Sequence, residues 1–487
     1  MRPTTRGELA LAIAASGASC SVPIADPLAL RDLAAAPESS VDIAMARVVE
    51  GRSPTTSGTF CWPKDDGTER RMTYLDPFDE VIYRALVGRF VQQIEATIDR
   101  GRVLAARPLT SRPFWRLENF SVGARARTEL ATAYLDKPDV AVMATADVRR
   151  HFYRVSGALV RDRLDAIPGS DSAKRALVRW LDDLEPRSGI SGLPVGHEPS
   201  SLLGNFVLGP CDAFMAQLSV EWLRWMDDTW IFAASTSEAE EVYAGLCGVL
   251  SELGLEANAT KWNVYPTDVA HGVVRSALND YMAPALGDAA SAGTEARDLF
   301  GIAIDDPDHG QRELRRALTV LTKRRDDLAV EALQEAPNLI RYAPEYWSRY
   351  LCALAKDKAI RKTIDMDWLE ECVVSPRSQY ADAERLVVMP ALAEAQPSKA
   401  TGRSLLGLAR SHGSPRIRVG AAAVWGRAKG WKADHAVEGA VDAPEFGTRR
   451  AFALTLADKK IAKLPAAVDK LRAADPELEP TLAYVGA

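Results

Sequence analysis

The sequence lacks several features that mark particular classes of protein. Its six cysteines form no Cys-x-x-Cys pair, so their spacing predicts neither a zinc site nor a disulfide framework and favours a reducing, cytoplasmic environment. No apolar segment is long enough to cross a membrane, and no low-complexity block interrupts the chain. An alanine-rich stretch, residues 9–25, follows Arg2 and Arg6, and we expect it to belong to an N-terminal helix rather than to a signal peptide.

The charge balance is acidic overall but uneven along the chain. The 487 residues carry a formal net charge of −6 and are 47% hydrophobic, which allows two or more domains with cores of their own. Residues 100–127 nevertheless hold seven arginines against one glutamate, with three aromatic residues among them. Such a segment either binds phosphates and stacks on bases, as in proteins that bind nucleic acids, or forms a solvated basic surface. Composition alone leaves both interpretations open.

The pattern of apolar residues divides the chain into three regions. We expect residues 1–60 to be a helical N-terminal segment, residues 61–300 to mix strands with helices, and residues 301–487 to be helical throughout. In the last region, residues 414–425 and 445–456 resemble each other, which favours either a HEAT-like repeat or an ordinary helical bundle. A basic run at residues 311–325 either lines a channel for nucleic acid or forms a solvated helix face. The predicted fold class is α+β, followed by an all-α domain.

A pair of carboxylates lies in the middle of residues 221–235, EWLRWMDDTWIFAAS. Apolar residues flank Asp227 and Asp228 on both sides, so the pattern predicts a strand, a tight turn and a second strand. Adjacent carboxylates at an apolar hairpin tip repel each other and lose hydration, which is costly unless a cation is present. Hard divalent cations such as Mg²⁺ prefer oxygen ligands of this kind, although an Asp-Asp pair is also common in plain turns.

A third carboxylate follows a short apolar run upstream of this pair. Residues 140–144 are expected to form a buried strand that leads to Asp147. If this strand lies beside the hairpin, three carboxylates converge and can hold two metal ions for in-line phosphoryl transfer.

Two further segments complete an ordered set. Residues 192–205 form a glycine- and proline-rich loop that runs into an apolar helix, where exposed backbone can approach a nucleotide or a template strand. Residues 254–261 place Lys261 after a helix end. There it is either a solvated surface lysine or a proton donor and counter-charge for a leaving pyrophosphate. Each segment alone is unspecific, and the ordered set is the stronger signal.

In this order the segments resemble the palm of reverse transcriptases, over residues 60–270. Asp147 matches the first catalytic motif, and residues 192–205 look like the GLPxG…S…LxN motif of bacterial members. Residues 224–228 are similar to the motif Arg-aromatic-x-Asp-Asp, and residues 254–261 to the motif GL…N..K. The chain departs from the family in having Trp225 in place of tyrosine and Val195 in place of glutamine.

The resemblance implies a role for each matching residue. Asp147 and Asp227 would ligate two Mg²⁺ ions, with Asp228 supporting them in the same metal site and Mn²⁺ as an alternative ion, and Lys261 would assist catalysis. Contacts to the substrate would come from four further residues: Arg71, Phe152, Gly196 and Ser200.

Two of these substrate contacts have defined tasks in the family. Phe152 falls at the position of a steric gate, where a ring excludes a ribose 2′ hydroxyl and favours deoxynucleotides. Arg71 is the candidate for binding the triphosphate. Otherwise Phe152 is a core residue, as many phenylalanines are.

A palm followed by a long helical region is similar to bacterial abortive-infection and other defence-associated reverse transcriptases. The resemblance implies antiphage defence by DNA synthesis from dNTPs, either untemplated and protein-primed or templated by a noncoding RNA. It also implies a homo-oligomer that binds its DNA product and does not associate with a membrane. Three alternatives stay open: a templated reverse transcriptase of a mobile element, a palm-type RNA polymerase, and a catalytically inactive scaffold. Val195 weighs against the first alternative and Phe152 against the second.

Overall fold

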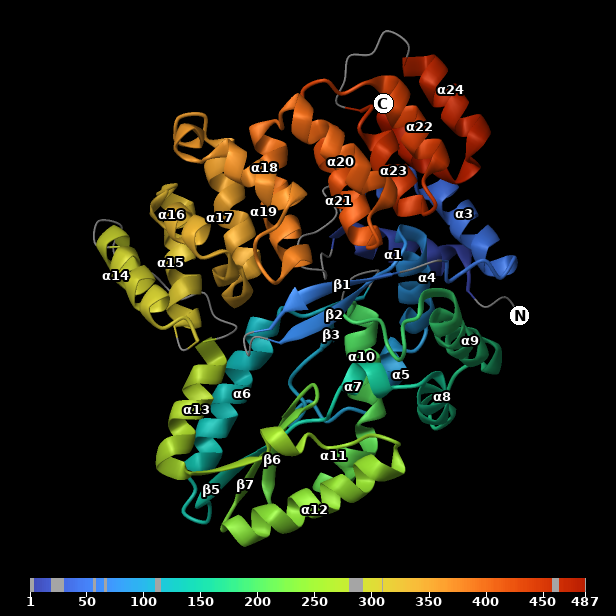
Figure 1. The fold of residues 1–487 in the computed structure, drawn as a ribbon. Coiled ribbons are helices and arrows are strands. Elements are labelled where there is room, and N and C mark those ends of the chain that lie inside the picture. Colours follow the sequence, from blue (N-terminus) through green and yellow to red (C-terminus); the bar gives the residue numbers. More distant parts are fainter. Residues whose placement is uncertain are drawn as a thin grey trace. The chain divides into compact units, whose positions relative to one another are not determined.

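The structure is a computed structural model of the chain. It describes residues 4–18, 30–55, 58–64, 68–109, 115–279, 292–308, 310–457 and 464–486. Helices dominate, and the strands form small antiparallel sheets, which confirms the expectation of a mixed α and β fold (Figure 1). Within the described ranges, no helix is long and apolar enough to cross a membrane. The five cysteines in those ranges are all free, and Cys20 lies outside them.

The chain folds into two compact units, each built from separate stretches of sequence. The first consists of Met1–Ala15, Ala44–Thr55 and Phe78–Met282; the second consists of Ser16–Ile43, Thr56–Pro77 and Ala283–Ala487. Residues 56–77 therefore belong with the C-terminal helices, whereas the sequence-based boundaries assign residues 61–77 to the fingers and palm. As functional domains, the ranges 1–60, 61–300 and 301–487 stay a prediction.

A four-stranded antiparallel sheet forms the centre of the first unit, in the order β6-β7-β5-β8. Its strands are β5 (Val142–Ala146), β6 (Glu221–Trp225), β7 (Asp228–Ala233) and β8 (Asn263–Pro266). The expected hairpin is present as β6 and β7, in which Trp225 pairs with Asp228. The expected strand before Asp147 is β5, and Ala146 at its end pairs with Thr229 of β7. The sheet thus brings the end of β5 to the turn of the hairpin.

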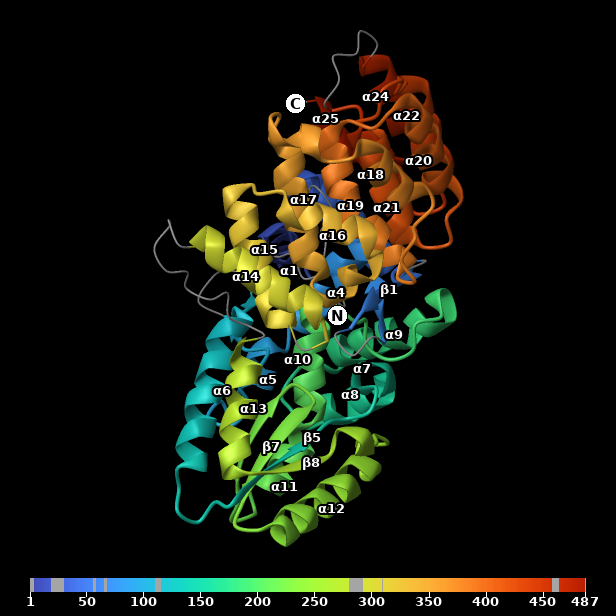
Figure 2. The same cartoon turned by 60° about the vertical axis from the view of Figure 1, so that its left-hand side comes forward.

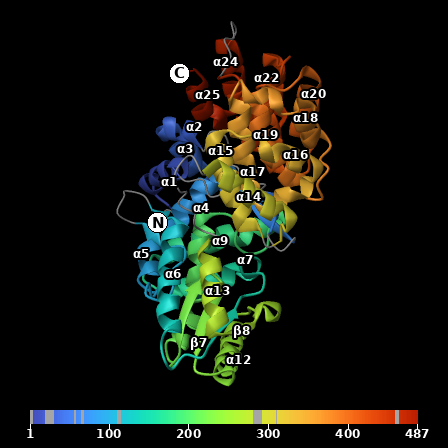
Figure 3. The same ribbon diagram turned by 90° about the vertical axis from the view of Figure 1, so that its left-hand side faces the viewer.

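One face of this sheet is covered by α6 (Phe120–Leu135) and α13 (Thr267–Asn279), which run side by side (Figures 2 and 3). Because side chains alternate along a strand, every second residue of β6 and β7 faces these helices. The buried cluster on this face contains Leu223, Trp225, Trp230 and Phe232 from the hairpin, together with small residues of the two helices. Burial of these large rings is the main favourable contribution to this layer.

Two further helices of the first unit pack against the sheet directly or one layer away. The helix α12 (Thr236–Glu252) packs on β5 and β7, and α11 (Gly209–Met215) packs on α12. The other elements are α1 (Arg6–Ala18), α4 (Pro77–Gly88), α5 (Val91–Glu95), β3 (Pro108–Leu109), β4 (Arg116–Leu117), α7 (His151–Arg154), α8 (Gly157–Asp165), α9 (Asp171–Ser188), α10 (Glu198–Val207) and η1 (Ala259–Lys261). The helix α3 (Pro37–Val49) contributes to both units, and α1 and α4 each extend a little way into the second.

The second unit is a stack of helices with one added hairpin, β1 (Gly58–Pro63) and β2 (Glu69–Tyr74). Helices follow one another in chain order, and α15, α17, α19, α21 and α23 each pack on the next (Figure 1). The full set is α2 (Arg31–Ala35), α14 (Ala292–Asp305), α15 (Gln311–Arg324), α16 (Leu328–Glu335), η2 (Pro337–Tyr342), α17 (Pro344–Lys356), η3 (Ile360–Thr363), α18 (Met366–Val374), α19 (Ala381–Ala395), α20 (Lys399–Ser411), α21 (Pro415–Trp425), α22 (Ala433–Asp442), α23 (Phe446–Leu454), α24 (Leu464–Ala474), η4 (Pro476–Leu478) and α25 (Glu479–Gly486).

Candidate polymerase active site

The two expected carboxylate segments meet at one edge of the sheet in the first unit. Asp147 directly follows β5, and Asp227 lies in the two-residue turn between β6 and β7. Pairing of Ala146 with Thr229 fixes these positions next to each other. At these positions the negative charge of Asp147 contributes to raising the pKa of Asp227. The structure therefore brings together the carboxylates that the sequence pattern singled out.

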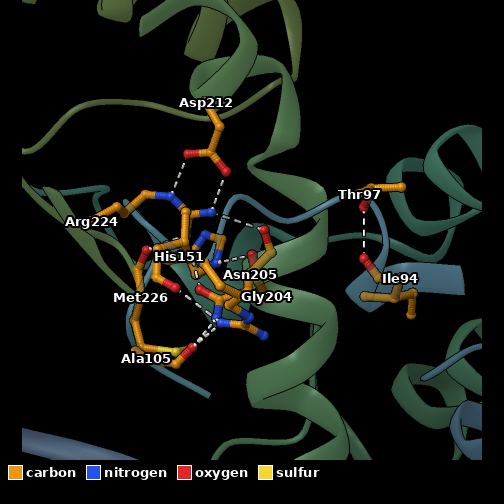
Figure 4. A network of polar contacts seen from close by, with 11 residues as sticks. Ile94, Thr97, Ala105, His151, Gly204, Asn205, Asp212, Arg224 and Met226 are labelled. Atoms are coloured by element: carbon orange, nitrogen blue, oxygen red, sulfur yellow. Dashed lines mark hydrogen bonds and ion pairs between the residues drawn. The ribbon is translucent and has the colours of Figure 1, made fainter. Parts of the chain in front are cut away.

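Arg224, which is only 2% exposed, supports the turn that carries Asp227. Its guanidinium donates to both carboxylate oxygens of Asp212 at 2.7 and 2.6 Å and to the Asn205 side chain at 2.9 Å (Figure 4). It also donates to the carbonyl oxygen of Met226 at 2.7 Å. Met226 has a φ of 56°, a left-handed conformation that is unfavourable for a residue with a side chain. The buried ion pair holds this strained turn in place.

Residues 254–261 contact Asp147 through both backbone and side chains. The backbone N–H of Asn258 donates to the carbonyl oxygen of Asp147 at 2.7 Å, and Val148 forms a bridge with Ala257. This pairing places two donors on the Asp147 carboxylate. Asn258 Nδ2 lies 3.0 Å from Oδ1, and Lys261 Nζ lies 2.8 Å from Oδ2.

The electrostatics of the site follow from these contacts. Burial, followed by the negative charge of Asp147 and that of Asp228, raises the pKa of Asp227 from 3.8 to about 6. Partial burial alone would lower the pKa of Lys261, but the hydrogen bond and charge of Asp147 outweigh it and raise that pKa. Lys261 is therefore held in its charged form, whereas burial and two neighbouring carboxylates disfavour the charged form of Asp227.

Asp228 has a different partner. Arg127 of α6 donates from Nη2 to Asp228 Oδ2 at 2.7 Å, and the Arg127 side chain is 6% exposed. Its guanidinium carbon lies 3.4 Å from the ring centroid of Trp230 and 6.0 Å from that of Trp225. Arg127 is one of the seven arginines of the basic segment. Two others of that segment are also paired internally, Arg100 with Glu95 and Arg102 with Glu221.

Phe152 lies on α7, the short helix that follows the Asp147 turn. Two glycines lie close to it: a Cβ on Gly204 would meet the Phe152 ring at 3.3 Å, and one on Gly192 would meet the Phe152 carbonyl oxygen at 2.2 Å. The backbone N–H of Leu193 donates to that carbonyl at 2.7 Å. The neighbouring His151 is 2% exposed, with Nε2 against the Gly204 carbonyl, and burial lowers its pKa to about 4. Glycines at these two positions therefore leave room for residues 151–153.

The remaining predicted substrate residues lie in three different settings. Gly196 has a φ of 99°, which favours glycine, and belongs to the loop that precedes α10. Ser200 is fully buried on α10, where its hydroxyl lies 3.0 Å from that of Tyr83. Arg71 lies on β2 of the second unit, opposite Cys61 of β1. The structure thus places Phe152 on the helix that follows Asp147, brings the loop of Gly196 to Phe152 through Leu193, and shows Ser200 in contact with Tyr83.

A divalent cation fits the charges at this site. In the described part of the chain, no group of three or more His, Cys, Asp or Glu side chains is arranged to hold a metal ion directly. Burial, together with the negative charges of Asp147 and Asp228, raises the pKa of Asp227, and a divalent cation beside these carboxylates would favour the charged form. Asp147 and Asp227 are the residues that would hold such an ion, with Asp228 beside them.

Sequence reasoning missed the groups that hold the carboxylates in place. Arg127 and Asp212 are 101 and 12 residues from their partners Asp228 and Arg224, and no local pattern joins them. The arginine-rich composition of residues 100–127 was the only available signal for Arg127. Asn258 belongs to a recognised motif, but its contact with Asp147 follows only from the bridge between residues 148 and 257.

No protein-family model matches the sequence, and no curated protein matches it significantly.

Proposed function

We propose that this chain is a DNA polymerase of the reverse transcriptase type that acts in bacterial antiphage defence. The observation that carries the proposal is the meeting of Asp147 after β5 with Asp227 in the β6–β7 turn and Asp228 at the start of β7. Antiparallel strands that present three carboxylates at one sheet edge suit phosphoryl transfer assisted by two metal ions. Lys261, bound to Asp147 at 2.8 Å, supplies the positive charge next to them.

The residues around the carboxylates support a nucleotide substrate. Bound Mg²⁺, with Mn²⁺ as the alternative, would activate the attacking 3′ hydroxyl and offset charge on the transferred phosphate. Lys261 is positioned to donate a proton or a counter-charge to the leaving pyrophosphate. The Phe152 ring, on the helix after Asp147, would exclude a ribose 2′ hydroxyl and so select dNTPs. The stacked helices of the second unit are of the kind that the defence-associated resemblance implies.

The test is an incorporation assay with Mg²⁺ and each labelled dNTP, singly and mixed, without added template or primer. The matched control is the double variant Asp227→Asn with Asp228→Asn, which removes charge but little volume. Label that resists ribonuclease and stays on protein until protease is added supports untemplated, protein-primed synthesis. Synthesis only after template and primer or co-purified RNA are added supports a copying enzyme with an RNA partner. No incorporation under any of these conditions would overturn the proposal and favour the inactive scaffold.

The defence role needs a test in cells. Cells that carry the wild-type chain should resist a panel of phages, while cells that carry the double variant should not. Equal sensitivity of the two strains to every phage would contradict the defence role and leave the polymerase activity standing. Incorporation of rNTPs in place of dNTPs would instead favour a palm-type RNA polymerase.

A further inference from the structure

The start of α10 is held by two contacts with α4. The hydroxyl of Ser200 lies 3.0 Å from that of Tyr83, and both side chains are fully buried. Beside this pair, Arg84 Nη1 donates to Glu198 Oε2 at 2.7 Å, in an ion pair that is largely buried. Because a fully buried hydroxyl offers no surface to a nucleotide, the contact with Tyr83 is the interaction through which Ser200 can act.

The ring of Tyr83 is itself fixed by α9. It stacks on the ring of Trp180, with centroids 4.6 Å apart and planes 5° from parallel. Trp180 Nε1 donates to Ser53 Oγ at 2.9 Å, and Ser53 donates in turn to Asp79 of α4 at 2.7 Å. Rings packed in this way lose several contacts at once if they move, so the Tyr83 hydroxyl is a fixed point for α10.

The second half of α10 is attached to the carboxylate turn instead. Asn205 donates to the Ala105 carbonyl at 2.7 Å and accepts from Arg224 at 2.9 Å (Figure 4). Arg224 also donates to the carbonyl oxygen of Met226 in that turn. The helix therefore has two separate attachments, and loss of the one at Ser200 leaves the carboxylate turn supported.

Between these two attachments, α10 packs against Phe152. Gly204 follows Ser200 by about one helical turn, so the two residues lie on nearly the same side of the helix. A Cβ on Gly204 would meet the Phe152 ring at 3.3 Å, and the Leu193 N–H before α10 donates to the Phe152 carbonyl at 2.7 Å. A shift or rotation at the start of α10 would therefore move Phe152.

We propose that Ser200 is a positioning residue. Together with Tyr83 and Arg84 it fixes the start of α10, so that Phe152 keeps the position from which it selects the sugar of the nucleotide. The inference deepens the proposed function and rests on it for the role of Phe152. It gives Ser200 a contact with α4 in place of the contact with substrate that the sequence resemblance implies.

A double-mutant cycle separates positioning from contact with the substrate. Tyr83→Phe and Ser200→Ala each remove one partner of the same hydroxyl pair, and the readout is kcat and KM for a matched dNTP and rNTP. We expect each variant to lower the preference for the dNTP at least about threefold, and the double variant to lower it no further. The value of kcat with the dNTP should stay within about twofold of wild type, because Asn205 still supports the carboxylate turn.

The control for this cycle is Ser251→Ala, at an exposed serine of α12. It should leave the preference unchanged. An effect of Ser200→Ala without any effect of Tyr83→Phe would overturn the proposal, since a direct contact of Ser200 with the substrate predicts that pattern. An unchanged preference in both variants would overturn it as well.

The ion pair with Arg84 allows a second comparison, which includes a conservative variant. Glu198→Gln keeps an acceptor for the guanidinium, whereas Glu198→Ala removes it. We expect Glu198→Ala to lower the preference for the dNTP and Glu198→Gln to keep most of it. Equal preferences in these two variants would contradict the proposal.

Hydrogen exchange measures the same positioning without any nucleotide. Tyr83→Phe and Ser200→Ala should speed exchange at the Leu193 N–H. The Asn258 N–H, which donates to Asp147, should exchange as in wild type. Unchanged exchange at Leu193 would overturn the proposal. Faster exchange there, with no incorporation by wild type, would leave the positioning contact standing and reject the polymerase; incorporation with unchanged exchange and unchanged preference would do the reverse.

Discussion

The ionised form of Asp227 destabilises the folded chain, because it is partly buried beside Asp147 and Asp228. Its pKa is raised to about 6 in the folded chain, above its ordinary value of 3.8. The folded state therefore holds the proton more tightly, and stability falls as pH rises between these two values. Above about pH 6 we expect Asp227→Asn to raise the free energy of unfolding by about 1–2 kcal/mol, although it stops incorporation.

Thermal unfolding in the presence of a chelator, at about pH 4 and about pH 8, measures this effect. The variant should be more stable than wild type only at the higher pH. Added Mg²⁺ should stabilise wild type more than the variant, because a bound cation offsets the crowded charges. A variant that is no more stable than wild type at the higher pH would contradict this account of the site.

His151 has the opposite pH dependence in the same range. Burial lowers its pKa from 6.5 to about 4, so between these pH values the unfolded chain binds a proton at His151 and the folded chain does not. Stability contributed by the neutral ring is therefore lost as pH falls from about 6.5 to about 4, by up to about 3 kcal/mol. His151→Gln keeps a donor for the Gly204 carbonyl and cannot ionise. We expect its unfolding temperature to fall less steeply than that of wild type over this range; parallel curves would reject the explanation.

At the scale of elements, the hairpin of β6 and β7 depends on one buried arginine. Arg224 joins the turn at Met226 to Asp212 and Asn205, on the helices behind the sheet. Arg224→Met leaves the Asp212 carboxylate, which is 14% exposed, without its partner. We expect a loss of about 3–5 kcal/mol in stability. Asp212→Asn, which keeps an acceptor for the guanidinium, should lose less. Incorporation per folded molecule should fall in both variants, since the left-handed turn at Met226 loses support.

The close packing of α10 on α7 allows a test of whether the position of Phe152 determines which nucleotide is selected. Gly204 faces the rings of His151 and Phe152, and an added Cβ would meet them at 3.1 and 3.3 Å. The rings must then shift by a few tenths of an ångström. We expect Gly204→Ala to lower the preference for dNTPs over rNTPs by about tenfold, because Phe152 is displaced. Steady-state kcat/KM for a matched dNTP and rNTP measures this preference, and Gly248→Ala, on α12 with open space at its Cβ, is the control. An unchanged ratio would show that the Phe152 ring does not select the sugar of the nucleotide.

Local patterns predicted those parts of the site that lie within one hairpin or one strand. The apolar flanks of Asp227 predicted β6 and β7, and the apolar run before Asp147 predicted β5. They did not predict β8, because residues 263–266 are short and lack alternation, nor the pairing of Arg127 with Asp228 across 101 residues. Side-chain pairs that join distant elements depend on the packing of whole helices. A single sequence gives at most a compositional signal for such pairs, as the arginine-rich residues 100–127 do for Arg127.

At the scale of the whole molecule, each unit draws together segments that are far apart in the chain. The second unit takes in residues 16–43, and an ion pair buried within it ties α2 to the C-terminal helices. Arg450 of α23 donates to Asp32 from Nε and Nη2 at 2.8 and 2.5 Å, and Thr481 of α25 donates to the same carboxylate at 2.7 Å. Both charged side chains are no more than 1% exposed. Burial acts to raise the pKa of Asp32, but Arg450 outweighs it and keeps that pKa below its ordinary value.

Breaking this pair from one side should destabilise the second unit strongly. Arg450→Met leaves the Asp32 carboxylate buried without a counter-charge, and we expect a loss of about 3–5 kcal/mol. Asp32→Asn together with Arg450→Met removes both charges and should lose less than Arg450→Met alone. Because the pKa of Asp32 is lowered, wild type keeps this stability above about pH 4 and loses it below, whereas the double variant should not. Calorimetric unfolding at several pH values, with limited proteolysis of residues 16–43 as a second readout, measures these differences. Equal stability of the single and double variants would mean that α2 is held by apolar packing rather than by the ion pair.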